Sequence, residues 1–177
     1  LFAMRVLAYD PYLSAEEIAA RGAEKVALDR LMSESDYVSA NCPLTEETRG
    51  MIGARQFALM KPDAFFITTC RGFIHDEKAL AEALANKRIA GAGLDVWEEE
   101  PPPPDHPLLQ FDNVLVSPHT AGVTKEARAN MGRIAATQLI DALDGKRPPR
   151  IVNPDAWPHY ASRFERAFGK APAKAEA

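Results

Sequence analysis

The chain has 177 residues, which is enough for one domain with a core of its own. Hydrophobic residues make up 46% of it and charged residues 26%, a balance typical of globular rather than disordered proteins. The net charge of −4 argues against binding of nucleic acid, and no apolar stretch approaches the roughly 20 residues needed to cross a membrane.

The start of the chain and its two cysteines bear on location. The chain begins with Leu1 and has neither the basic segment nor the long apolar segment of a signal peptide. Cys42 and Cys70 do not form a CxxC pair, so neither structural zinc nor another metal site is expected. Two reduced, buried thiols predict a cytoplasmic protein.

Short apolar runs predict six strands, at residues 4–9, 25–28, 37–41, 64–69, 90–96 and 114–117. Several of these runs are continuously apolar, which is typical of a parallel sheet with both faces covered by helices.

Helix signals lie between the predicted strands. Ser14 with Glu17 forms a capping-box pattern, and Gly22 stands where that helix would stop. Further helices are expected at 29–34, 54–60 and 76–86, and Thr124 is expected to cap a long helix to about residue 143. The inward stripe predicted for this long helix is Ala127, Met131, Ile134, Ala135, Gln138 and Ala142. The alternation predicts an α/β fold with a doubly wound parallel sheet.

Polar or glycine-rich segments follow most of the predicted strands. Ligands of open parallel sheets bind beyond the carboxyl ends of the strands. Asp10 follows the first strand, NCPLT the third, TTCRG the fourth, DVWEEEPP the fifth and SPHTAG the sixth. One edge of the sheet therefore gathers Asp10, Arg71, Asp95, three consecutive glutamates and His119.

Each of these residues also has a plain structural explanation. Arg71 fits a surface cation, Asp95 a turn former and His119 a loop histidine that caps a turn. The acidic run at 98–100, followed by four prolines that exclude a helix or ladder, fits a solvated loop. Because the fold brings these loops to one edge, the grouping favours a site.

The grouping suits the reduction of a 2-oxo acid beside a dinucleotide. An arginine binds the substrate carboxylate with its planar fork of donors and polarises the carbonyl. A histidine protonates the carbonyl oxygen while the cofactor delivers hydride to carbon. A carboxylate beside the histidine keeps the ring charged and oriented. Spacing alone does not choose among the three glutamates.

Four segments resemble the NAD-binding domain of the D-isomer-specific 2-hydroxyacid dehydrogenases, which include phosphoglycerate dehydrogenases and glyoxylate/hydroxypyruvate reductases. They are NCPLTEETRGMIG, MKPDAFFITTCRG, GAGLDVWEEEPP and VLVSPHTAGVTKEA. The resemblance covers roughly residues 4–154, with the four motifs in order and at suitable spacing.

The resemblance implies three catalytic residues. Arg71 matches the arginine that binds the substrate carboxylate, and His119 matches the acid/base histidine. The family pattern places the partner of this histidine five residues after the strand-end Asp95, which selects Glu100.

The resemblance also implies a cofactor site for NAD. Asp10 matches the acid that binds the ribose, which favours NAD over NADP because a carboxylate repels a 2′-phosphate. Asp95 matches the contact to the nicotinamide amide, and Gly122 the close backbone approach after the histidine. The loop under the adenosine and the strand end at the nicotinamide ribose complete the set, which is Asp10, Cys42, Pro43, Thr69, Cys70, Arg71, Asp95, His119 and Gly122.

The sequence departs from the family pattern at four places. Asn41 stands where many members have histidine, Thr68 where many have asparagine, and Cys70 where alanine is usual. Glu100 argues against the formate dehydrogenase branch, which has glutamine there. The largest departure is at the start, where the family's first strand and glycine-rich turn are absent.

This absence predicts an N-terminally incomplete sheet. The strand ending at Asp10 and the strand ending at Asn41 lose a shared neighbour, so two unpaired edges are expected to face a gap. Residues 1–150 are predicted to form a partial dinucleotide-binding domain. Residues 151–177 are predicted to return toward an absent substrate domain, with a helical beginning near residue 161 and a fraying tail.

The function predicted from these features is hydride transfer between NAD(H) and a small D-2-hydroxy or 2-oxo acid. The chain by itself is expected to be inactive and to bind NAD weakly or not at all, because the pyrophosphate-binding turn is absent. The full-length parent is expected to be a homodimer. The alternatives are a non-catalytic dinucleotide-sensing module of corepressor type and an inactive truncated product.

Overall fold

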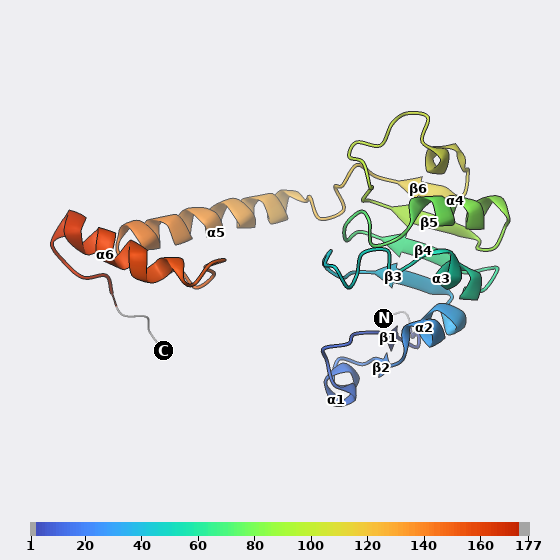
Figure 1. Cartoon of the computed structure of the whole chain (residues 1–177), viewed down its shortest axis with the longest axis horizontal. Helices are drawn as coiled ribbons and strands as arrows, with labels where there is room; N and C mark the ends of the chain where they lie inside the picture. The colour runs from blue at the N-terminus through green and yellow to red at the C-terminus, as the bar shows by residue number, and fades with distance from the viewer. Residues whose placement is uncertain (1–2, 174–177) are drawn as a thin grey trace. The chain divides into compact units, whose positions relative to one another are not determined.

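A computed structural model describes residues 3–173 of the chain. It divides into two compact units, with the boundary along the chain between Ala121 and Gly122 (Figure 1). The predicted boundary at residue 150 falls inside the second unit.

The strands lie in the first unit, and their number and order match the six predicted ones. Their bounds are β1 (Leu7–Ala8), β2 (Glu24–Lys25), β3 (Tyr37–Ala40), β4 (Phe65–Thr68), β5 (Gly91–Leu94) and β6 (Val114–Val116). The second strand ends earlier than predicted, because Leu28 is already the first residue of a helix.

The helices of the first unit alternate with these strands. Their bounds are α1 (Ala15–Ala19), α2 (Leu28–Glu34), α3 (Ala54–Leu59), α4 (Glu77–Ala85) and the short 3-10 helix η1 (Pro107–Gln110). The predicted capping box is present, since the Ser14 hydroxyl accepts the N–H of Glu17 and the Glu17 carboxylate accepts the N–H of Ser14. Gly22 follows with a φ of +83°, as expected after a helix end.

The strands form two separate parallel sheets. One is β1–β2, and the other has the order β3–β4–β5–β6, with Val38 opposite Phe66 and Phe66 opposite Ala92. Within residues 3–173 no ladder joins β1 to β3. The predicted gap between the first and third strands is therefore confirmed.

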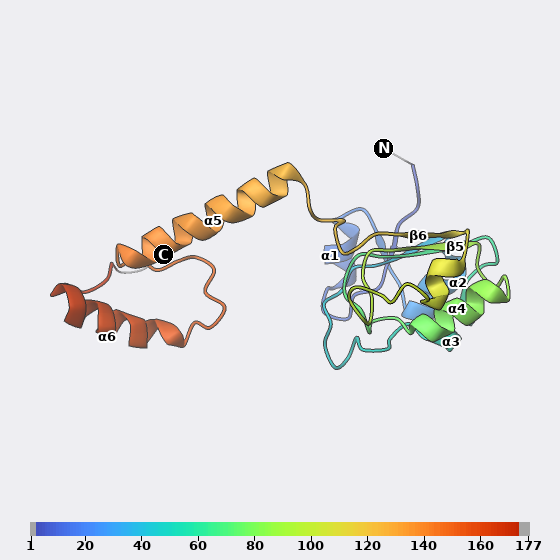
Figure 2. The same cartoon turned by 90° about the horizontal axis from the view of Figure 1, so that it is seen from above.

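Helices cover one face of the four-stranded sheet. In the described part of the first unit, α2, α3 and α4 lie on the same side of it (Figure 2). Phe66 points into this layer and meets Phe57 of α3 edge to face, with 5.3 Å between ring centroids. The opposite face exposes Tyr37 and Leu115 to 63% and 81%. The expectation of strands buried on both faces is therefore wrong for this sheet.

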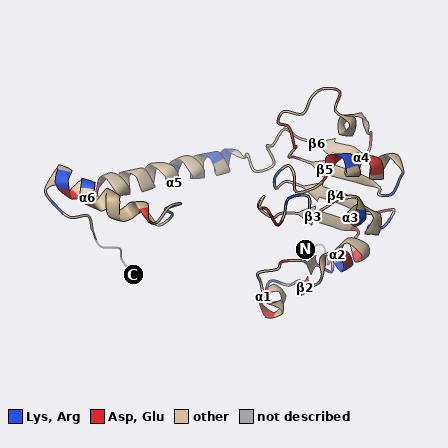
Figure 3. Cartoon of the chain, in the orientation of Figure 1, with Lys and Arg blue, Asp and Glu red and all other residues tan. Residues whose placement is uncertain are grey.

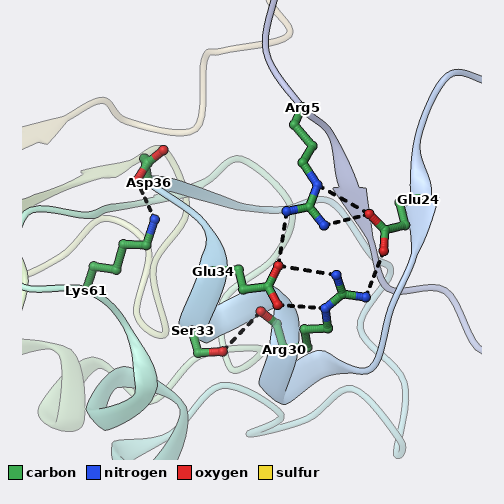
Figure 4. A network of polar contacts seen from close by, with 7 residues as sticks. All are labelled: Arg5, Glu24, Arg30, Ser33, Glu34, Asp36 and Lys61. Atoms are coloured by element: carbon green, nitrogen blue, oxygen red, sulfur yellow. Dashed lines mark hydrogen bonds and ion pairs between the residues drawn. The ribbon is translucent and has the colours of Figure 1, made fainter.

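Charges are excluded from the four-stranded sheet, whose strands read YVSA, FFIT, GAGL and VLV (Figure 3). An ion-pair network instead joins β2, α2 and the segment just before β1 (Figure 4). Arg5 and Arg30 each bind both Glu24 and Glu34, with N–O distances from 2.6 to 3.2 Å. Because these side chains are well exposed, the pairs add little to the stability of the fold.

The second unit contains α5 (Lys125–Leu143) and α6 (Ala156–Phe168). Thr124 caps α5 as predicted, with its hydroxyl accepting the N–H of Ala127. The predicted inward stripe of α5 is not buried, and Met131 is 60% exposed. The C-terminal helix begins before residue 161, and residues 174–177 of the predicted tail lie outside the described residues. In the described residues, no helix has the length and apolar composition of a membrane span.

Candidate active site

Three parallel strands bring predicted catalytic and cofactor-binding residues to one edge of the sheet. Arg71 follows β4, Asp95 follows β5 directly, and His119 follows β6. Because β4, β5 and β6 are parallel neighbours, their carboxyl ends open on the same side. Gly72 packs against the carbonyl of Trp97, where a Cβ would collide, so the loops after β4 and β5 approach closely.

His119 and Glu100 form a direct pair, as predicted. The Nδ1 atom of His119 lies 2.8 Å from Oε2 of Glu100, and the two side chains are 41% and 39% exposed. Since a carboxylate only accepts hydrogen bonds, Nδ1 carries a hydrogen and Nε2 is the atom left to exchange a proton with a ligand. The bond from His119 lowers the pKa of Glu100, against an opposing effect of burial, and the nearby charge of Arg71 acts in the same direction.

Asp95 builds the turn that carries His119. Its carbonyl accepts the N–H of His119 at 2.8 Å, and its buried carboxylate accepts the Ser117 hydroxyl at 2.5 Å and the N–H groups of Thr120 and Ala121. Burial opposes ionisation of Asp95, but these hydrogen bonds outweigh it and lower its pKa. They also hold His119 at a φ of +54°, which is unusual for a residue with a side chain.

This use of Asp95 within the chain agrees with its plain structural explanation as a turn former. Its predicted contact with the nicotinamide amide stays a prediction. Arg71 is exposed, and its Nη1 donates to the carbonyl of Cys70 at 2.6 Å.

Three predicted cofactor residues line one cavity of about 500 Å³, namely Asp10, Cys42 and Pro43. The cavity lies at β1, α2 and β3, with apolar walls that include Leu31 and Val38. Its size is within the range of small-molecule sites. An acid at the end of a strand beside apolar walls fits an adenosine with its ribose.

One carboxylate oxygen of Asp10 is hydrogen-bonded within its own loop. Its Oδ1 accepts the N–H groups of Tyr12 and Leu13 at 2.8 and 3.2 Å, which closes a tight turn after β1. The same residue is therefore both the strand terminator and a lining residue of the cavity. Cys42 is half-buried rather than buried, and burial raises the pKa of its thiol.

The other predicted cofactor residues lie outside this cavity. Thr69 is exposed, and the buried Cys70 has its Sγ 3.1 Å from the hydroxyl of Thr68. Gly122 is the first residue of the second unit, and a Cβ there would meet no atom of the chain within 4 Å. The close approach of its backbone to the cofactor stays a prediction.

Sequence reasoning missed several polar groups of the site. Ser117 binds Asp95, and Glu77 binds both the loop that carries Glu100 and His106. Glu77 resembles a solvated residue in the sequence, because it opens a helix with charges on its outer face. Its proximity to the acidic run depends on the contact between α4 and the loop after β5, which the sequence alone does not reveal.

The chain matches known proteins over most of its length. Residues 1–121 match the family model described as the NAD binding domain of D-isomer specific 2-hydroxyacid dehydrogenases. A glyoxylate reductase of Korarchaeum cryptofilum is 47% identical over 152 residues, which is 86% of this chain and 46% of that protein. A D-3-phosphoglycerate dehydrogenase of Archaeoglobus fulgidus is 43% identical over 85% of this chain and 28% of that protein. The chain thus spans less than half of these two relatives.

Solved structures give the same result. The crystal structure of D-lactate dehydrogenase with NAD+ from Lactobacillus jensenii superposes with a TM-score of 0.78 and 35% identity, over 84% of this chain and 48% of that one. The parallel sheets and flanking helices are therefore of the Rossmann type found in these enzymes. From its fold, its site and these matches, the chain belongs to the family of D-isomer specific 2-hydroxyacid dehydrogenases, in which it corresponds to the NAD-binding domain.

Proposed function

We propose that this chain contributes the cofactor-binding and catalytic part of an NAD-dependent oxidoreductase that interconverts a small D-2-hydroxy acid and its 2-oxo acid. The observation that carries the proposal is the 2.8 Å contact between His119 Nδ1 and Glu100 Oε2 at the sheet edge that Arg71 shares. The relatives named above are dehydrogenases and reductases, which favours an enzyme over a corepressor-type module.

The three residues have separate tasks in this reaction. Arg71 binds the substrate carboxylate through its planar guanidinium. His119 donates a proton from Nε2 to the carbonyl oxygen during reduction and takes it back during oxidation. Glu100 keeps the ring in place through Nδ1 and balances its positive charge. NAD, when bound, supplies or accepts the hydride.

The cofactor would be held by residues from several loops. Asp10, Cys42 and Pro43 would hold the adenosine end, since they line one cavity. The nicotinamide end is assigned to the remaining predicted residues, which are Thr69, Cys70, Arg71, Asp95, His119 and Gly122.

A chimera tests this proposal. This chain replaces the matching segment of the Korarchaeum cryptofilum glyoxylate reductase, and oxidation of NADH by glyoxylate is followed. We expect turnover in the chimera, and a loss of at least about tenfold to a hundredfold for Arg71→Ala and His119→Gln, given what general acid–base catalysis contributes. Lys78→Ala, which removes an exposed cation of α4, serves as the control and retains the rate.

Near-normal rates for Arg71→Ala or His119→Gln in the chimera would contradict the site. The unfused chain is assayed in parallel. We expect no reduction by it, because its sequence holds no glycine-rich turn for the pyrophosphate.

The finer proposals on partners and location rest on separate observations. A homodimer is supported by α5, which has 19 residues, none of them buried, and exposes large apolar side chains. A cytoplasmic location is supported by Cys42 and Cys70, which are both free thiols. The net charge of −4 supports partners other than nucleic acid or anionic membranes.

A further inference from the structure

The loop that carries Glu100 has few hydrogen bonds of its own. Residues 101–104 are prolines, which have no N–H to donate. In the described structure, the backbone bond inside the loop joins the N–H of His106 to the carbonyl of Pro103 at 2.9 Å. Apart from the bond that the N–H of Trp97 donates to Oε1 of Glu100, the position of Glu100 therefore depends on contacts from outside the loop.

Glu77 supplies such contacts to both ends of the loop. It is the first residue of α4 and is 9% exposed. Its Oε1 accepts the N–H of Glu98 at 2.7 Å, and its Oε2 lies 3.0 Å from Nε2 of His106. Nδ1 of His106 accepts the N–H of Leu108 at 3.3 Å, so Nε2 carries the hydrogen that is donated to Glu77.

Glu98 returns the contact to α4. Its Oε1 accepts the N–H of Glu77 at 3.3 Å, beside the cap in which Asp76 accepts the N–H of Ala79. The two glutamates thus exchange backbone-to-carboxylate bonds at the positive end of the helix, where carboxylates are stabilised. This assigns different partners to two members of the acidic run, since Glu98 binds α4 and Glu100 binds His119.

Trp97 connects this arrangement to the catalytic pair. Its N–H donates to Oε1 of Glu100 at 3.1 Å, and its indole N–H donates to the carbonyl of Ser117 at 3.3 Å. Its ring also meets the ring of His106 edge to face at 5.4 Å. The same short segment therefore touches Glu77, Glu100 and the loop of His119.

We propose that Glu77, by holding Glu98 and His106, is a positioning residue that places Glu100 against His119. The catalytic meaning of this role rests on the proposed function. The placement itself is a property of the chain, and it is measurable without turnover.

The test uses NMR of the full chain with Glu77→Ala, Glu77→Gln and the control Glu82→Ala, which removes an exposed carboxylate of the same helix. In Glu77→Ala we expect the Trp97 amide to exchange at least about tenfold faster. We also expect the pKa of Glu100 to rise toward its ordinary value, because the bond that lowers it is lost. Glu82→Ala should change neither quantity.

Glu77→Gln keeps the side-chain volume and decides the matter if Glu77→Ala fails to fold. An amide accepts on one atom only, so one end of the loop is released whichever way the amide turns. We expect the same changes, smaller in size. A folded Glu77 variant with wild-type exchange of Trp97 and wild-type titration of Glu100 would overturn the proposal. Failure of the chimera to reduce glyoxylate would not affect it.

Discussion

His75 lies in the core, 1% exposed, with neither ring nitrogen hydrogen-bonded to any residue that the structure describes. Its ring packs against Phe66 with 5.4 Å between centroids. Burial lowers the pKa of His75 to about 4, and the nearby charge of Asp76 only partly opposes this. The fold therefore holds this histidine in its neutral form and leaves two polar atoms without partners, which costs stability.

Replacement of His75 should reduce the loss of folding stability at acidic pH. Above pH 6.5 the ring is neutral in both states, whereas between pH 6.5 and 4 only the unfolded chain binds the proton. Stability should therefore fall as the pH falls, with a contribution from His75 of about 2 kcal/mol between pH 7 and pH 5. The His75→Leu variant should lack this contribution. Its free energy of unfolding, measured with urea, should therefore be higher than that of the wild type at pH 5.

The exposed His159 of α6 provides the matched control. We expect His159→Leu to retain the wild-type difference in unfolding free energy between pH 7 and pH 5. An unchanged pH dependence in His75→Leu would show that the buried ring is not the group that senses acid.

At the scale of single residues, the sequence predicted the placement of those residues whose position follows from the order of the strands. Arg71, the acidic run and His119 follow neighbouring strands, so parallel pairing predicts that they lie at one edge, whereas the choice of Glu100 within the run came from the resemblance. Glu77 and His75 could not be predicted, because their surroundings come from contacts between α4, the loop after β5 and the core.

Among the elements, α5 ends at a turn that requires a glycine. Gly145 has a φ of +79°, and a Cβ there would lie 2.6 Å from Cζ of the buried Phe164 in α6. The N–H groups of Gly145 and Lys146 close the helix end by donating to the carbonyls of Ala142 and Asp141. The turn and the contact between the two helices therefore require the same residue.

Gly145→Ala should destabilise the second unit by about 2 kcal/mol or more, since it combines strain with overpacking. Gly132→Ala is its control, because Gly132 lies inside α5 in open space, and there alanine should stabilise by about 0.5–1 kcal/mol. Thermal unfolding followed at the NMR signal of the Trp157 indole measures both. Shifts of equal sign would refute the role of Gly145.

The elements differ in how far the sequence predicted them. Caps are local signals, and Ser14, Asp76 and Thr124 begin helices within a residue or so of the expected bounds. The second strand was misplaced because Ala27 and Leu28 already form the N-cap and the first residue of α2. The burial of α5 could not be predicted, since it depends on neighbours that periodicity does not identify.

On the scale of the whole molecule, the proposed homodimer predicts where association can be disrupted. Met131, Leu139 and Leu143 are each at least 60% exposed and recur at helical spacing on α5. A second copy would cover such a stripe, whereas lysines in it would be buried without a partner charge.

We therefore expect the chimera with both Leu139→Lys and Leu143→Lys to sediment as a monomer under conditions where the unmodified chimera has twice the monomer mass. Thr137→Lys, at an exposed polar position of the same helix, should leave the chimera a dimer. An unmodified chimera that is monomeric at every concentration tested would contradict the proposal.

The split of the sheet sets a limit on ligand affinity. β1 and β2 pair over two residues each, and such a short two-stranded sheet is marginally stable. Asp10 follows β1 by two residues, so it is correctly placed only in the fraction of molecules in which this pair is closed. Any ligand that needs Asp10 must also close the pair, and its apparent dissociation constant is the intrinsic one divided by the closed fraction. For a nucleotide held by Asp10, as proposed, affinity would thereby partly measure local folding.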